Sequence, residues 1–329
     1  MSDAEFPILV VIENDQQHAK PASLRAISAA RQLGDSYSLL CLGRGIETVV
    51  AGVSDLGAAR IYVADHEALA DPLADRYAKV VVDVAAQDGS RTILAAGSTF
   101  SRDLLPRVAA LIDAPMLSDV THIESTPDQT IYQRPVNAGS EVATVTLESP
   151  RRVLTIRAGA FELPQRTDER SPRQSVAVSR DALPNGMQFV SREQRQSQRP
   201  ELSEARVVVA GGRPIKDREA FEQLVGRLAD TLGGAVGATR ALVDAGVVPN
   251  DWQIGQTGKV LSPELYIGIG ISGAVQHLAG IMDARVIVAI NKDPTAPIMK
   301  MASYALTGDL FELVPQLIQA LQRGDEPGR

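Results

Sequence analysis

The chain has 329 residues, which is more than one hydrophobic core usually organises, so we expect two domains of roughly 130 to 200 residues. With 44% hydrophobic residues, 22% charged residues and a net charge of -7, the composition is that of an ordinary soluble globular protein and excludes a disordered or membrane-integral chain. The acidic balance and the 4% aromatic content also disfavour nucleic acid as a partner.

The single cysteine, Cys41, lies in an apolar run, so we interpret it as a core residue. One cysteine excludes an intrachain disulfide and any cysteine-based zinc or iron–sulfur site. The N-terminus carries Asp3 and Glu5 before an apolar run that begins at Ile8, which is typical of neither a signal peptide nor a transit segment. We therefore expect a cytoplasmic protein without a membrane span.

The first 115 residues alternate short apolar runs with longer amphipathic segments. Strands are expected at 8–12, 37–42, 61–64 and 93–96. Helices are expected at 21–33, 72–87 and 102–112, the first two beginning with proline at the favoured first position. Alternation of this kind predicts a mostly parallel sheet covered on both faces.

From residue 116 the pattern shortens to strand-like stretches separated by turn residues. The stretches are 120–124, 130–134, 141–147 and 152–157. Because no helical segment separates them, they predict an antiparallel β extension of the first domain.

Residues 164–200 contain four prolines, seven arginines and many Gln and Ser residues, which is typical of an interdomain connection. Two interpretations remain open at this point. The segment is either a solvated, partly ordered linker or an arm that contacts a partner subunit.

The alternation of strands and helices resumes at residue 206. Strands are expected at 207–210, 265–269, 286–290 and 304–307, and helices at 218–232, 274–282 and 310–322. The fold class is therefore α/β, with two doubly wound parallel-sheet domains of which the first carries an antiparallel extension. We place their boundary between residues 195 and 196, giving an N-terminal domain with the linker (1–195) and a C-terminal domain (196–329).

The turns after parallel strands are the first places to look for ligand contacts. The turn Gly211-Gly212-Arg213-Pro214 follows the first strand of the second domain. Its glycines allow close backbone approach, and the arginine could bind an anion bidentately. The same turn could also serve only to begin a helix.

A second glycine turn, 268–273, spells G-x-G-x-x-G between a predicted strand and a predicted helix. This context is typical of a pyrophosphate cradle, to which Ser272 would add a hydroxyl donor. A dinucleotide-binding unit would carry an acidic residue at the end of the next strand, where this chain has Asn291. A standard NAD site is therefore disfavoured.

The run Gly255-Gln-Thr-Gly-Lys259 resembles a Walker A loop but lacks two of its residues. Gln253 stands where the first glycine is required, and Val260 follows the lysine in place of Ser or Thr. His277 is one of four histidines, none of which pairs with another at metal-ligand spacing. It is either a packed helix residue or an imidazole that faces a ligand, and no catalytic constellation of nucleophile, base and acid can be assembled around it.

Several segments of the second domain closely resemble the electron transfer flavoprotein alpha subunit. They are 237–246, 248–251, 255–259, 263–280 and 288–298, and the match runs almost unbroken from 206 to 315. The stretch from Pro-Glu-Leu-Tyr at 263–266 to Gln-His-Leu-Ala-Gly at 276–280 is the most specific part. The first domain matches more loosely, through Arg-Pro-Val-Asn-Ala-Gly at 134–139.

The resemblance implies an electron carrier with bound FAD and no substrate turnover of its own. It implies a heterodimer with a beta subunit, flavoprotein dehydrogenases of the acyl-CoA or N-methyl amine type as donors, and an electron transfer flavoprotein-quinone oxidoreductase as acceptor. Two alternatives from other classes are an NAD- or nucleotide-binding enzyme on a Rossmann-like fold and a structural or regulatory nucleotide-binding module. The absence of a ribose-binding acid and of a catalytic group disfavours the enzyme.

The resemblance also implies a set of FAD-binding residues. The set comprises Arg213, Thr239, Arg240, Ile254, Gly255, Gln256, Thr257, Gly270, Ile271, Ser272, Gly273, Ala274, Gln276, His277, Asn291, Asp309 and Leu310. Arg213, Thr239 and the 270–273 turn would bind near the pyrophosphate, and Asn291 and Asp309 would hold the adenosine end. Thr257 would bind flavin N5, Arg240 would lie over the ring and His277 would donate to O2. Thr239 stands where the family usually has serine. Because threonine also carries a hydroxyl, we expect the same contact with FAD.

Overall fold

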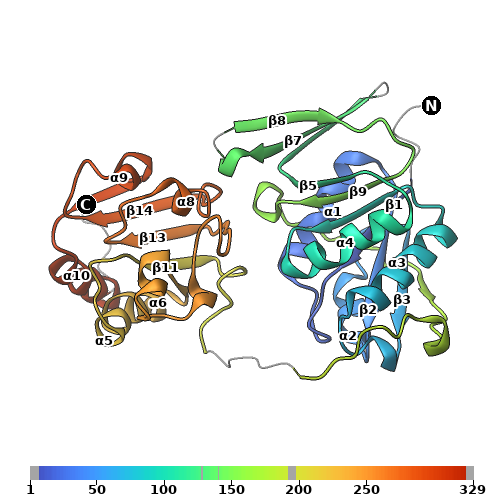
Figure 1. Cartoon of the computed structure of the whole chain (residues 1–329), viewed down its shortest axis with the longest axis horizontal. Coiled ribbons are helices and arrows are strands. Elements are labelled where there is room, and N and C mark those ends of the chain that lie inside the picture. Colours follow the sequence, from blue (N-terminus) through green and yellow to red (C-terminus); the bar gives the residue numbers. More distant parts are fainter. Residues whose placement is uncertain (1–6, 127–128, 140, 192–197, 324–329) are drawn as a thin grey trace. The chain divides into compact units, whose positions relative to one another are not determined.

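The computed structural model describes residues 7–126, 129–139, 141–191 and 198–323. The chain forms two compact units, Met1–Glu193 and Gln194–Arg329, which are described separately (Figure 1). The predicted boundary at 195/196 lies outside the described residues.

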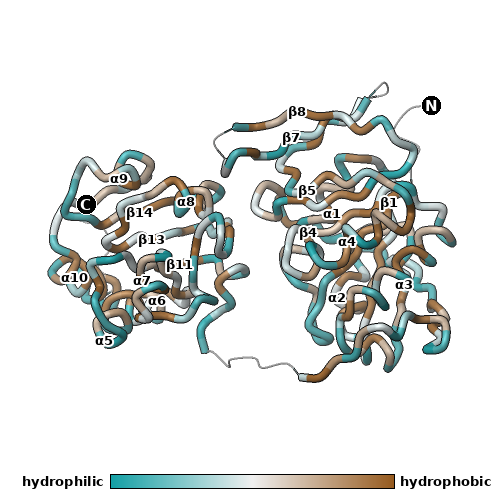
Figure 2. Tube along the Cα trace, viewed as in Figure 1, coloured by the Kyte–Doolittle hydropathy of each residue, from teal (hydrophilic) through white to brown (hydrophobic). Residues whose placement is uncertain are grey.

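The first unit is built on a seven-stranded sheet in which all neighbouring strands are parallel. The order is β10 (Arg173–Ser175), β3 (Arg60–Asp65), β2 (Tyr37–Gly43), β1 (Ile8–Ile12), β4 (Thr92–Ala96), β9 (Arg152–Ile156) and β5 (Met116–Val120). The central strands are hydrophobic along their length, β1 most visibly (Figure 2). This is expected of parallel strands that are buried on both faces.

Helices cover both faces of this sheet, as predicted. The helices are α1 (Pro21–Leu33), α2 (Glu47–Val53), α3 (Ala74–Asp88) and α4 (Thr99–Leu111). One core packs α1 and α2 against the sheet, and a second core packs α3 and α4 against the other face. Cys41 is fully buried in the first core, and burial raises the pKa of its thiol to about 12, so it is a packing residue as interpreted from the sequence.

Two predicted helix starts differ from the structure. Pro72 does not occupy the first position of α3, because Leu73 is extended and the helix begins at Ala74. The next helix begins at Thr99 rather than at residue 102, because Ser98 and Ser101 form a capping box that extends the helix toward the strand.

The antiparallel extension is smaller than predicted. It contains only β6 (His122–Ser125), β7 (Thr130–Val136) and β8 (Glu141–Thr146). The predicted strand at 120–124 is split at Thr121 between β5 and β6, and the predicted strand at 152–157 is β9. Because β9 inserts between β4 and β5, its five buried residues belong to the parallel sheet.

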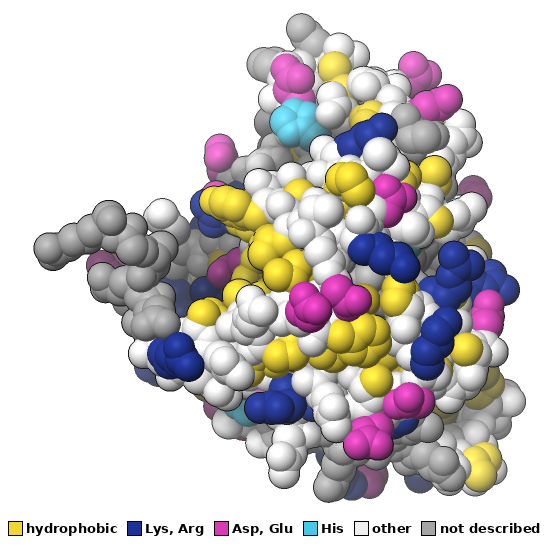
Figure 3. Space-filling view, turned by 90° about the vertical axis from the view of Figure 1, so that its left-hand side faces the viewer, with side chains coloured by type: hydrophobic (Ala, Val, Ile, Leu, Met, Phe, Trp, Pro, Cys, Tyr) yellow, Lys and Arg dark blue, Asp and Glu magenta, His cyan; other side chains and the backbone are white. Residues whose placement is uncertain are grey.

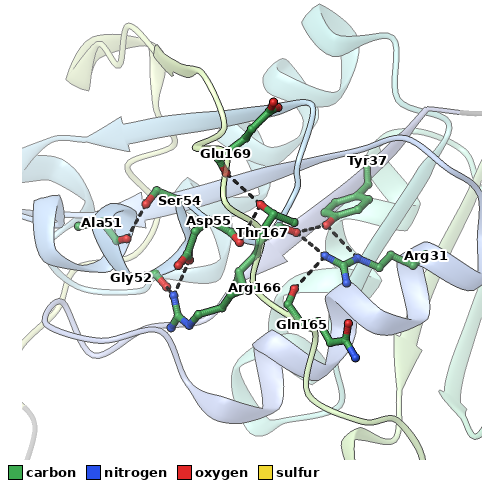
Figure 4. A network of polar contacts seen from close by, with 11 residues as sticks. Arg31, Tyr37, Ala51, Gly52, Ser54, Asp55, Gln165, Arg166, Thr167 and Glu169 are labelled. Atoms are coloured by element: carbon green, nitrogen blue, oxygen red, sulfur yellow. Dashed lines mark hydrogen bonds and ion pairs between the residues drawn. The ribbon is translucent and has the colours of Figure 1, made fainter.

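Part of the predicted interdomain connection is an integral piece of the first unit (Figure 4). Arg166 forms an ion pair with Asp55, and the Thr167 amide donates to the Asp55 carbonyl at 2.7 Å. A few residues later β10 adds a parallel strand to the edge of β3. Val176, Val178 and Leu183 then pack against a core of the same unit, so the linker prediction is wrong for 165–183. Beyond it Met187, Phe189 and Val190 are exposed, so the arm interpretation stays a proposal for that stretch.

The second unit has a five-stranded, all-parallel sheet in the order β12-β11-β13-β14-β15. The strands are β11 (Val207–Gly211), β12 (Ala235–Ala238), β13 (Leu265–Ile269), β14 (Val286–Asn291) and β15 (Tyr304–Thr307). One core packs α5, α6, α7 and α10 against the sheet, and the other core includes α8 and α9. The sheet is therefore doubly wound, as predicted.

The helices of this unit match the prediction in part. They are α5 (Arg218–Phe221), α6 (Arg227–Leu232), α7 (Arg240–Asp244), α8 (Val275–Leu278), α9 (Pro297–Met301) and α10 (Leu310–Arg323). The predicted helix at 218–232 is continuous but contains a π-helical turn, Glu222–Gly226. The predicted helix at 274–282 shortens to α8. The strand β12 and the helices α7 and α9 were not predicted.

Hydrophobic side chains gather on the face of the second unit that carries α9, β15 and α10 (Figure 3). The large exposed residues on these elements are Met301, Tyr304, Leu306, Phe311 and Leu321. All four residues of β15 are exposed, which is unusual for a parallel strand. Within the described residues, no helix has the length and apolar character to cross a bilayer.

A test of this packing is Leu228→Ala, which removes a fully buried side chain from α6. The loss of transfer energy and the resulting cavity should lower the free energy of unfolding of the second unit by about 2 to 5 kcal/mol. Trp252, the only tryptophan, reports this unit selectively in urea unfolding followed by fluorescence. The same substitution at the exposed Leu321 should change stability by less than about 0.5 kcal/mol. Equal losses at both positions would contradict the packing.

Candidate functional site

The strand order of the second unit reverses direction between β11 and β13. Ligands of open parallel sheets bind beyond the carboxyl ends of the strands at such a reversal. The two glycine turns meet at this point, because the Gly212 amide donates to the Ile269 carbonyl at 2.9 Å. A Cβ atom at Gly212 would lie 2.1 Å from the Gly270 carbonyl oxygen, so only glycine fits.

A cavity of about 550 Å³ opens above this glycine contact. Its volume lies within the range of roughly 300 to 1,000 Å³ that is typical of small-molecule and cofactor sites. The turns after β11, β12, β13 and β14 line it, together with the loop at 253–257.

The cavity brings together fifteen of the seventeen predicted residues. They are Arg213, Thr239, Arg240, Ile254, Gly255, Gln256, Thr257, Gly270, Ile271, Ser272, Gly273, Ala274, Gln276, His277 and Asn291. Asp309 and Leu310 are not among the lining residues. The Asp309 carboxylate accepts from the Phe311 amide at 2.8 Å at the start of α10, and Leu310 is buried in the core.

The lining also includes residues that the prediction missed. They are Gly212, Pro214, Ala241, Gln253, Lys292, Asp293 and Ala296. Gly212 belonged to a turn already singled out, and Lys292 and Asp293 directly follow a predicted residue. Gln253 was noted only as a mismatch to the Walker A pattern, so its position in the cavity had no signal in the sequence.

The loop at 253–259 is a tight turn whose backbone groups bind one another. Gly258 donates to the Gly255 carbonyl at 3.0 Å, and Gly255 donates to the Lys259 carbonyl at 3.1 Å. The Gln256 amide donates to the Gln276 carbonyl at 2.8 Å, which holds the loop against α8. These amides are therefore engaged, which is a physical reason why the run is not a phosphate-binding P-loop.

The two arginines that line the cavity remain accessible for a ligand. The Arg240 side chain is 68% exposed, and among the described residues its one ion-pair partner is Asp244 on its own helix, at 3.3 Å. Arg213 is exposed, and no acidic side chain among the described residues pairs with it. An exposed ion pair between residues four apart on a helix contributes little to stability. Arg240 can therefore leave Asp244 and contact a ligand at a small cost in folding free energy.

Two family descriptions match the chain. Residues 8–181 match the "Electron transfer flavoprotein domain", and residues 201–282 match the "Electron transfer flavoprotein FAD-binding domain". A probable mitochondrial electron transfer flavoprotein subunit alpha of Caenorhabditis elegans is 45% identical over 95% of this chain and 93% of the relative. The alpha subunits of Pseudomonas aeruginosa and Paracoccus denitrificans are 40% and 42% identical, covering 95% and 91% of this chain and 99% and 94% of the relatives.

The chain belongs to the electron transfer flavoprotein alpha subunit family. Its second unit contains the FAD-binding domain of that family, and FAD is its cofactor. The nucleotide-binding enzyme that the sequence left open is not favoured by these matches.

The polar groups of the cavity fit the pyrophosphate of a flavin nucleotide. The amides of Ser272, Gly273 and Ala274 have no protein acceptor in the described part of the chain, so they are available to an anion. The buried Thr239 hydroxyl likewise lacks a hydrogen-bond partner among the described residues. Unsatisfied buried polar atoms are costly in a folded protein, and a phosphate oxygen would satisfy them.

His277 forms a buried pair with Tyr266 of β13. The Tyr266 hydroxyl lies 2.7 Å from His277 Nε2, and the two residues are 0% and 6% exposed. Burial lowers the pKa of His277 to about 4, and the Ile254 backbone offsets only part of this effect. His277 is therefore neutral at pH 7 in the FAD-free chain, and it can act toward a ligand as a hydrogen-bonding imidazole.

Gly212→Ala tests the glycine contact. Because its Cβ atom would overlap the Gly270 carbonyl oxygen, the two turns must separate, and FAD affinity should fall at least tenfold. Isothermal titration of the FAD-free protein measures the effect. Gly52→Ala, in helix α2 with no atom within 4 Å of the new Cβ, should keep the affinity of the wild type. Unaltered affinity in Gly212→Ala would contradict the site.

The low pKa of His277 predicts a pH dependence of stability. Between its ordinary value of 6.5 and about 4, the unfolded chain binds a proton that the folded chain does not bind. Stability should therefore be lost as the pH falls through this window, by about 3 kcal/mol for this residue in total. Urea unfolding of the FAD-free chain should show this component, and His277→Gln should lack it. A pH profile of His277→Gln that equals the profile of the wild type would contradict this prediction.

Proposed function

We propose that the chain binds FAD in the cavity of its second unit and, together with a beta subunit, carries single electrons between other proteins. The observation that supports this function most directly is the combination of free backbone amides and an unpartnered buried hydroxyl at the meeting point of two glycine turns. Such a site binds a nucleotide through its phosphates, and the cofactor supplies the electron chemistry when bound. The chain has no substrate turnover of its own in this proposal.

We assign the phosphate and adenosine end of FAD to the turns after the strands. Arg213, Thr239 and Ser272 would hold the pyrophosphate, together with the free amides of the Gly270 to Gly273 turn. The Gly270 amide is not one of them, because it donates to the Ile290 carbonyl at 2.8 Å. Asn291 would bind the adenosine end, and its amide already donates to the Ile271 carbonyl at 2.8 Å, which fixes its orientation. Asp309 and Leu310 lie outside the cavity lining, at the start of α10, so their contact requires the adenosine to extend beyond it.

The flavin ring is assigned to the other end of the cavity. Thr257 would donate to N5, with Ile254, Gly255 and Gln256 in the same loop. Arg240 would lie over the ring and place a positive charge near it. His277, which is neutral, would donate a hydrogen bond to O2 rather than supply a full charge.

His277→Ala should lower the first one-electron reduction potential of the bound flavin. Loss of a desolvated hydrogen bond to a group that gains negative charge is worth on the order of 2 to 3 kcal/mol, or roughly 100 mV. Spectroelectrochemical titration of the heterodimer measures the shift, and circular dichroism verifies that the variant is folded. The exposed His122→Ala serves as control, with the potential of the wild type. A potential unaffected by His277→Ala would contradict this assignment.

Our proposal for the partners follows the family. They are an electron transfer flavoprotein beta subunit, flavoprotein dehydrogenases of the acyl-CoA or N-methyl amine type as donors, and an electron transfer flavoprotein-quinone oxidoreductase as acceptor. The uncovered apolar side chains on β15 and α10 fit a chain that associates with another protein. We also propose a cytoplasmic location, which fractionation of the native complex would test.

Purification of the native complex tests the whole proposal. A yellow complex that contains this chain, a second subunit and flavin bound to this chain would support it. A colourless monomer that binds NAD or AMP but takes up no FAD would contradict it and favour a nucleotide-binding enzyme or regulatory module.

A further inference from the structure

Gln253 is a buried polar residue that the proposed FAD contacts do not include. Its side chain is 6% exposed, yet it lines the cavity directly before the loop that carries Thr257. Its backbone is fixed from both sides, because its amide donates to the Asn250 carbonyl at 2.9 Å and its carbonyl accepts from the Lys259 amide at 2.8 Å. Its position is therefore set by the fold rather than by a ligand.

The side chain of Gln253 makes one directional contact. Its Nε2 atom lies 2.8 Å from Oγ1 of Thr257. An amide nitrogen can only donate, so the threonine hydroxyl must accept. The hydrogen of that hydroxyl is consequently not used in this contact and is free to point elsewhere.

Thr257 is exposed at the tip of its turn and lines the cavity. A hydroxyl that accepts one hydrogen bond becomes a better donor, because hydrogen bonds in a chain polarise one another. Because Gln253 donates and Thr257 accepts, the hydroxyl hydrogen of Thr257 stays free. The same contact makes the Thr257 hydroxyl a stronger hydrogen-bond donor toward the cavity.

We propose that Gln253 is a positioning residue that holds the Thr257 hydroxyl with its hydrogen directed at N5 of the flavin. The inference rests on the proposed function, in which Thr257 faces N5. Gln253 acts through Thr257 and needs no contact of its own with the cofactor.

The hydrogen bond between Gln253 and Thr257 needs the amide side chain at 253 and a tight turn that brings Thr257 near it. Gly258 permits that turn. A Cβ atom at Gly258 would lie 2.3 Å from the Gln253 carbonyl oxygen, so the turn closes directly onto the Gln253 backbone. Because backbone hydrogen bonds hold this closure, replacement of the Gln253 side chain should leave the turn in place. Gln253→Met keeps the length of the side chain and removes its donor.

A double-mutant cycle with Thr257→Val tests the proposal. In the FAD-loaded heterodimer, Gln253→Met should lower the equilibrium constant for uptake of the first electron about tenfold, which corresponds to a potential shift of 59 mV. In the Thr257→Val background the same substitution should have no further effect, since no hydroxyl remains to be positioned. Gln223→Met, at an exposed glutamine that donates to Glu219 at 3.1 Å, is the matched control and should leave the potential as in the wild type.

Gln253→Glu provides a second arm with nearly the same shape. A carboxylate accepts rather than donates, so it would take the Thr257 hydrogen and turn an oxygen lone pair toward N5. The first potential should fall further than in Gln253→Met. In the Thr257→Val background only the effect of the added charge should remain, and it should be smaller.

A readout without cofactor separates positioning from folding. In the FAD-free chain, the side-chain amide resonance of Gln253 should shift in Thr257→Val, and Trp252 fluorescence during urea unfolding verifies that each variant is folded. If Thr257→Val leaves the flavin potential unchanged, the proposed function of Thr257 fails. If Thr257→Val shifts the potential while Gln253→Met does not, the positioning role is overturned. An equal effect of Gln253→Met in both backgrounds would also overturn it, because Gln253 would then act on the flavin directly.

Discussion

The approach of two backbone turns at Gly212 and Gly270 is the constraint on which the site depends. Parallel pairing of β11 with β13 brings the ends of these strands together, with Gly211 opposite Ile269. Side chains at the next positions would force the turns apart, since a Cβ at Gly212 would meet the Gly270 carbonyl. The floor of the cavity is therefore made of backbone, which offers amide donors at distances that side chains could not reach.

Small residues also allow close backbone approach on the neighbouring strand, β12. A Cβ at Gly237 in β12 would lie 2.3 Å from Cδ1 of Ile254, so the small strand allows the 253–259 loop to lie against it. The bridge between Ala238 and Gln253 extends this contact. Small residues thus place the loop that carries Thr257, and they are also why β12 was missed, since Ala-Val-Gly-Ala has no strand pattern.

The sequence predicted well what local spacing determines. The strands around the glycine turns follow from residues adjacent in the chain, as does the interest of Arg213, Ser272 and His277. The other cavity residues were predicted from the resemblance to the flavoprotein family and not from local spacing. The prediction failed where a strand pairs with strands that are distant in the sequence. β9 has the composition of a strand, but no local pattern encodes its insertion between β4 and β5. The same holds for β10, and for Gln253, whose role depends on a contact across a turn.

All residues that line the cavity fall between Gly212 and Ala296, inside one compact unit. Among the residues that the structure describes, Leu183 is the last before this region whose side chain packs against a core of the first unit. The cavity lining is thus contained in one continuous stretch of the amino-acid sequence. Recombination in the intervening codons could exchange the first unit for another while the cavity lining is inherited whole.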